Sequence, residues 1–132
     1  MAKSDKQSKK SEMRKYRKMW RRHRKELIKL AKENRDYDYC WLHDFVITKV
    51  RHMYEYYSKG DNVWQSEESL NTILSSLKKV LDLEAEIDFL WDNYHSQNDK
   101  DASEYKNLLT KEHELYKEIY TTIGEWIQWW WD

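Results

Sequence analysis

Residues 66–95, SEESLNTILSSLKKVLDLEAEIDFLWDNYH, decide the fold. Apolar side chains recur in this segment at alternating steps of three and four residues, which places them on one stripe of an α-helix. Ser66 stands where its hydroxyl can cap the first turn. We therefore predict a long helix that forms the spine of the core. Its stripe consists of Leu70, Ile73, Leu77, Val80, Glu84, Ile87, Trp91 and Tyr94, with Leu74 and Leu81 beside it.

Three further helices are predicted around this spine. They span residues 11–34, 38–58 and 103–130, and the turns between them are NRDYDY, SKGDN and HSQNDKDAS. The chain has no proline and only two glycines, which leaves long helices uninterrupted. The predicted fold class is all-α, an antiparallel three-helix bundle over residues 38–132. The helix at 11–34 is either an arm or a fourth member of the bundle, and residues 1–10 are a flexible lead-in.

Gly124 interrupts the last predicted helix. A glycine inside a helix costs about 1 kcal/mol relative to alanine. We therefore expect a close backbone approach, or a bulky ring packed against this position.

Charge divides the chain into two opposite parts. Residues 1–35 hold 15 Lys or Arg and 4 Asp or Glu, a formal charge of +11. Residues 36–132 hold 9 and 20, a formal charge of −11. A basic amphipathic helix beside an acidic bundle indicates an anionic partner for the helix.

The segment 15–30, KYRKMWRRHRKELIKL, is the main candidate for a binding site. Arg and Lys neutralise phosphates, and aromatic rings stack on bases. The apolar stripe of this helix consists of Met13, Tyr16, Trp20, His23, Leu27 and Leu30. Two alternatives stay open: this stripe packs on the acidic bundle or on a second copy, or the helix lies on an anionic membrane surface. The residues predicted to contact nucleic acid are Lys15, Arg17, Lys18, Trp20, Arg21, Arg22, Arg24 and Lys25.

Lys49 and Glu84 both interrupt apolar stripes, on helices that are neighbours across the turn at Gly60. If the two side chains meet, they form a polar core pair that fixes the helix register, or they line a pocket for an anionic nucleotide. The alternative is that Lys49 extends outward and that the true stripe passes through Leu83.

The terminal segment WIQWWWD carries three consecutive tryptophans, Trp129, Trp130 and Trp131. Consecutive residues point in different directions around a helix, so these rings cannot all face one core. We predict an interface in which they contact another chain. The alternative is a clamp that folds back over the end of the bundle.

No group of residues indicates a reaction. The histidines are scattered, and Asp92 with His95 forms a single i, i+3 pair without the second pair that a di-metal bundle needs. We therefore expect no enzyme activity, no metal and no cofactor. Cys40 is the single cysteine, which favours a reducing compartment, and no stretch has the apolar length of a transmembrane segment.

Three segments resemble small, functionally uncharacterised helical proteins of tailed bacteriophages. They are MRKYRKMWRRHRKELIKLAKENRDYDYCWLHDF at 13–45, TKVRHMYEYY at 48–57 and WWD at 130–132. The resemblance implies an accessory protein in the cytoplasm of an infected host. Together with the charge pattern, it predicts a non-enzymatic protein that binds nucleic acid through its basic helix. A protein–protein interaction or oligomerisation module acting on a host protein is the alternative.

Overall fold

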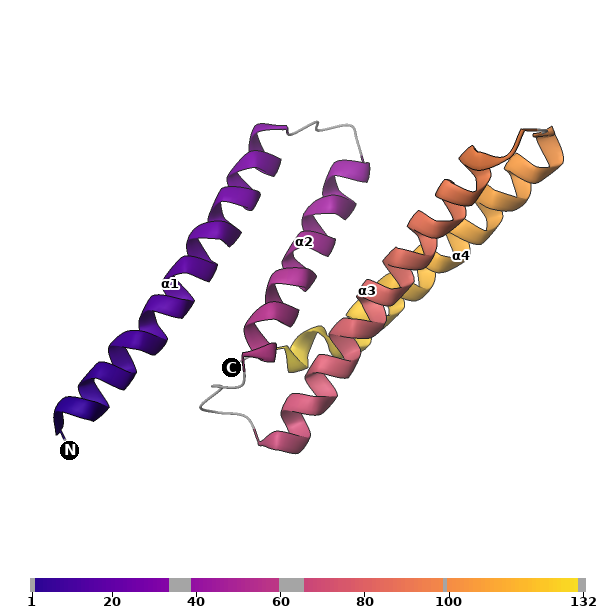
Figure 1. Cartoon of the computed structure of the whole chain (residues 1–132). Helices are drawn as coiled ribbons and strands as arrows, with labels where there is room; N and C mark the ends of the chain where they lie inside the picture. The colour runs from indigo at the N-terminus through magenta and orange to yellow at the C-terminus, as the bar shows by residue number, and fades with distance from the viewer. Residues whose placement is uncertain (1, 34–38, 60–65, 99, 131–132) are drawn as a thin grey trace. The chain divides into compact units, whose positions relative to one another are not determined.

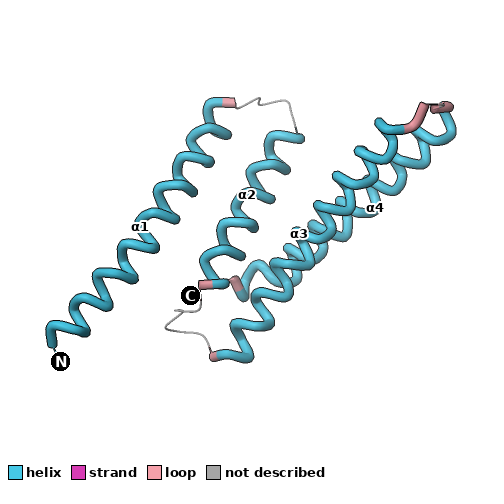
Figure 2. Tube along the Cα trace, in the orientation of Figure 1, coloured by secondary structure: helices cyan, strands magenta, loops and turns pink. Residues whose placement is uncertain are grey.

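A computed structural model describes residues 2–33, 39–59, 66–98 and 100–130, without the side chains of residues 2–12 and Lys15. Four α-helices fill these ranges, namely α1 (Ala2–Lys32), α2 (Tyr39–Ser58), α3 (Glu67–Ser96) and α4 (Ala102–Trp126), and a short 3₁₀ helix η1 (Ile127–Trp129) follows the last (Figures 1 and 2). No described residue lies in a β-strand. The all-α prediction is confirmed, whereas the three-helix bundle with a basic arm stays a prediction.

The chain divides into two compact units, Met1–Thr48 and Lys49–Asp132. The first contains α1 and the start of α2, and the second contains the rest of α2 with α3, α4 and η1. The division falls inside α2, ten residues beyond the boundary at residue 38 that the charge pattern and the turn predict. Each unit is described by itself.

In the first unit, α1 is a continuous helix of 31 residues, about 46 Å long at 1.5 Å per residue. It begins at Ala2, so residues 2–10 are helical where the sequence predicts a flexible lead-in. Those residues lack an apolar stripe, but they also lack Gly and Pro, and Lys, Gln and Ala all favour helix.

The end of α1 is tied to the start of α2 by a hydrogen bond. The indole Nε1 of Trp41 donates to the backbone carbonyl of Leu30 at 2.5 Å. The same carbonyl accepts from the Glu33 amide at 3.1 Å, so the indole is a second donor at the end of α1, where carbonyls lack partners within the helix. Trp41 also packs on Phe45, with 5.9 Å between ring centroids.

In the second unit, α3 and α4 run side by side in opposite directions (Figure 1). Tyr94 near the end of α3 lies against Tyr105 near the start of α4, with 6.0 Å between ring centroids. Further along the pair, the indole of Trp91 donates to the Glu112 carboxylate. The predicted Ser66 cap is confirmed, since its hydroxyl accepts from the Ser69 amide at 3.2 Å. Asp101 caps α4 in the same way.

The buried side of α3 is rotated slightly from the predicted stripe. Leu83 is buried and Glu84 is half-buried, so the apolar stripe passes through Leu83. The buried residues of α3 are Ile73, Ser76, Leu77, Val80, Leu83 and Ile87, and those of α4 are Leu108, Ile119 and Thr122.

The C-terminal segment folds back onto α3 through Trp130. This side chain is 8% exposed, and its Nε1 donates to the Ser76 hydroxyl at 2.7 Å. The Ser76 hydroxyl in turn donates to the Ile73 carbonyl at 2.7 Å. Both polar groups are therefore satisfied inside the core, and Trp130 holds the chain end against α3.

Ser76→Ala is expected to lower the free energy of unfolding by about 1–3 kcal/mol, because it leaves the buried indole N–H of Trp130 without its acceptor. Ser75→Ala, at the neighbouring exposed position, is the control and should change stability by less than about 0.5 kcal/mol. Chemical denaturation followed by circular dichroism measures both. Equal effects of the two substitutions would contradict this role of Ser76.

The expectation of a close contact at Gly124 is wrong. A Cβ atom built there meets nothing within 4 Å. Gly124 lies inside α4, so Gly124→Ala is expected to stabilise the protein by about 1 kcal/mol through helix propensity. A thermal melt that shows no rise in the midpoint would count against a well-formed helix at this end of α4.

Candidate nucleic-acid interface

The basic side chains of α1 form an exposed face along the helix. All of its described members are exposed, namely Arg14, Arg17, Lys18, Arg21, Arg22, Arg24, Lys25, Lys29 and Lys32. From Arg14 to Lys32 they cover about 27 Å of helix. One strand of a duplex presents about eight phosphates over that length. Lys15 lies in α1, but its side chain is outside those described.

The opposite side of α1 is apolar and buried, centred on Met19 and His23. Met19 is 2% exposed and His23 is 8% exposed, with Tyr16, Leu27 and Leu30 half-buried. The predicted stripe contains all of these except Met19. Burial is thus shifted around the helix, and two members of the predicted stripe, Met13 and Trp20, are exposed at 46% and 42%.

Trp20 lies at the border between the buried side and the basic face. Its ring stacks on Tyr16, with 5.6 Å between centroids and 24° between ring planes. Arg17 precedes it by three residues and Arg24 follows it by four, so both guanidinium groups extend from the same side of the helix as the indole. An exposed aromatic ring is therefore flanked by two cations.

The two described terminal tryptophans, Trp129 and Trp130, differ in burial. Trp129 is 62% exposed, Trp130 is buried against Ser76, and Trp131 lies outside the described residues. Trp130 therefore matches the alternative prediction, in which the end of the chain folds back onto the bundle. Among the predicted interface residues that the structure describes, Trp129 is the one whose side chain is exposed to a partner.

Lys49 and Glu84 do not form a buried pair. Lys49 is exposed, as expected if its chain extends outward, and Glu84 is half-buried. The charge of Glu84 affects Tyr120 on α4 instead. Partial burial of Tyr120 and, as the smaller cause, the negative charge of Glu84 raise the pKa of Tyr120 above the ordinary 10.0. The predicted polar core pair requires a buried Lys49, so that prediction is wrong for this residue.

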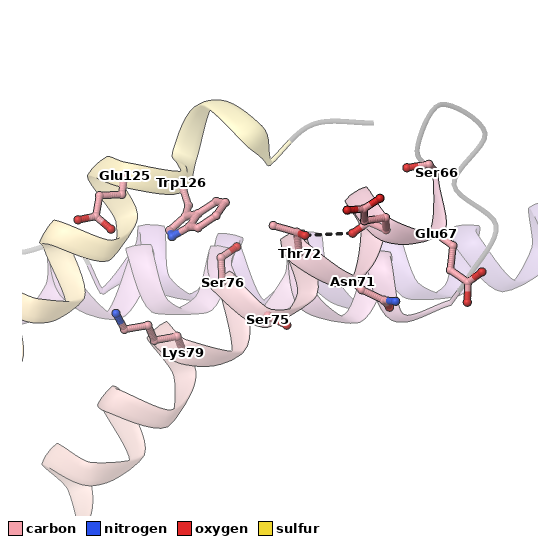
Figure 3. Close-up of a pocket in the computed structure, with 10 residues that line it drawn as sticks. Ser66, Glu67, Asn71, Thr72, Ser75, Ser76, Lys79, Glu125 and Trp126 are labelled. Carbon is pink, nitrogen blue, oxygen red and sulfur yellow. Dashed lines mark hydrogen bonds between the residues drawn. The ribbon is translucent and has the colours of Figure 1, made fainter.

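An open groove of about 1070 Å³ lies between the first half of α3 and the end of α4 (Figure 3). Glu67, Glu68 and Glu125 contribute carboxylates to its lining, against the single ammonium of Lys79. Trp126 supplies an aromatic side chain. This excess of negative charge disfavours an anionic nucleotide, and Lys49 is not among the lining residues, so the predicted nucleotide pocket finds no support here.

The described part of the chain offers few other groups that could form a reactive or metal-binding site. Cys40 is exposed, and no three His, Cys, Asp or Glu side chains among the described residues are arranged to hold a metal ion. None of the described helices is both long and apolar enough to cross a membrane. The basic face of α1 thus remains the strongest candidate for a binding site.

No protein-family model, curated protein or solved structure matches the chain. The resemblance to bacteriophage proteins therefore stays an expectation from the sequence. The function has to be argued from the chemistry of the chain itself.

Proposed function

We propose that the chain is a non-enzymatic accessory protein whose α1 helix binds nucleic acid through its basic face. The observation that supports this most is the row of exposed Arg and Lys along α1, opposite the buried side at Met19 and His23. When one side of a helix is packed, the opposite side stays accessible to phosphates. The part of the proposal that places the protein in a bacteriophage-infected cytoplasm rests on the sequence resemblance.

The charge of this face sets the expected strength and salt dependence of binding. Each phosphate neutralised by Lys or Arg releases condensed counterions, so the affinity falls as salt rises. With about six contacts among the exposed side chains, affinity for duplex DNA should fall about a thousandfold between about 50 and 200 mM salt.

A salt titration of the intact protein tests this function. Fluorescence anisotropy of a labelled oligonucleotide gives the dissociation constant at each salt concentration, and the slope of the logarithmic plot gives the number of phosphates contacted. Failure to bind any oligonucleotide at low salt would remove the proposal. A flat salt dependence would remove the phosphate-binding role of the basic face.

A protein–protein module is the second candidate, and the exposure of Trp129 and Ile127 favours it. These side chains are 62% and 56% exposed at the end of the chain, and large exposed rings are frequent anchors at interfaces. Light scattering at low and high salt separates the two candidates. A Trp129-dependent oligomer without oligonucleotide binding favours the protein–protein function, and a monomer that binds oligonucleotides favours the first.

A further inference from the structure

The position of Trp20 indicates which form of nucleic acid fits α1. Its indole is 42% exposed, whereas the neighbouring side chain of Met19 is 2% exposed. Tyr16, half-buried one turn earlier, stacks on one face of this indole and restricts its orientation. The exposed part of the ring is thus held in place before any ligand arrives, which lowers the entropic cost of binding.

The groups around Trp20 match a nucleotide whose base is unpaired. A flat aromatic ring stacks on the face of a base, whereas the bases of a duplex cover one another's faces and present only their edges. Stacking Trp20 into a duplex would require unstacking a base step, which costs a few kcal/mol. Arg17 and Arg24 are exposed beside the ring, and the exposed Arg21 is a helix neighbour of both, so the three can meet the phosphates near the stacked base.

We infer that α1 prefers single-stranded nucleic acid to duplex, with a base stacked on Trp20 and the neighbouring phosphates on Arg17, Arg21 and Arg24. This inference rests on the proposed function and narrows its ligand to an unpaired strand. DNA and RNA share the chemistry required, because stacking and phosphate contacts do not involve the 2′-hydroxyl.

Trp20→Ala in the full chain tests the inference, with Phe89→Ala as the control because Phe89 is an exposed aromatic residue in the other unit. Anisotropy is measured with a labelled strand of about 12 nucleotides, as DNA and as RNA, and with the duplex of the same sequence. Trp20→Ala should weaken binding of the strand roughly five- to a hundredfold and change duplex binding by less than about twofold. Phe89→Ala should change neither.

Trp20→Phe provides the second variant, because it keeps an aromatic face and should retain most of the affinity for the strand. Circular dichroism of each variant checks that helix content is preserved. The inference fails if Trp20→Ala weakens strand and duplex equally, or leaves both unchanged while the wild type binds. If the wild type binds no nucleic acid at low salt, the proposed function itself fails, so the two failures are distinguishable.

Discussion

The triple variant Arg17→Ala/Arg21→Ala/Arg24→Ala is expected to bind a single strand about two to three orders of magnitude more weakly than wild type at about 50 mM salt. The three guanidinium groups are exposed around Trp20, and a phosphate that no longer meets a guanidinium keeps its condensed counterions. The slope of log affinity against log salt should fall by about 2, at about 0.7 per phosphate. Anisotropy titrations at several salt concentrations measure both quantities.

The matched control is Lys106→Ala/Lys111→Ala/Lys117→Ala, which removes the same charge from exposed positions of α4. It should leave the slope unchanged, because these lysines lie outside the basic face. Arg22 is left intact in the test variant since it has an interaction partner within the chain. Equal effects of the two triple variants would show that overall charge, not the basic face, governs binding.

Leu77→Ala is expected to lower the free energy of unfolding by about 2–5 kcal/mol. Leu77 is 0% exposed on the buried side of α3, so its truncation removes the transfer free energy of the side chain and leaves a cavity. Denaturant unfolding monitored by circular dichroism gives the value.

Phe89→Ala is the control for this prediction. It removes a larger side chain from the same helix, but Phe89 is 67% exposed, so stability should change by less than about 0.5 kcal/mol. A larger destabilisation by Phe89→Ala than by Leu77→Ala would contradict the assignment of the buried side of α3.

The local features of the fold can be predicted from the sequence. Helix periodicity and the hydroxyl cap at Ser66 depend on residues close together in the chain, so a single segment contains the information needed. The basic residues of the candidate site are predictable for the same reason. A helix with so many cations must place most of them in water, whatever its apolar side contacts.

The features that depend on contacts between segments are harder to predict. Periodicity assigns Trp20 to the apolar stripe, whereas Met19, one position earlier, is the residue that is buried. Glu84 and Leu83 show the same shift on α3. The pairing of Trp130 with Ser76 joins residues 54 positions apart, and no local pattern indicates which of three adjacent tryptophans enters the core.

Photo-crosslinking of a single-stranded oligonucleotide to the intact protein tests the central claim most directly. Cleavage after Glu12 and Glu26 releases residues 13–26 as one fragment, which contains Trp20 and its flanking arginines. Mass spectrometry is expected to find the crosslinked nucleotide on this fragment. A crosslink confined to fragments from residues 67–126, with residues 13–26 unmodified, would contradict binding through α1.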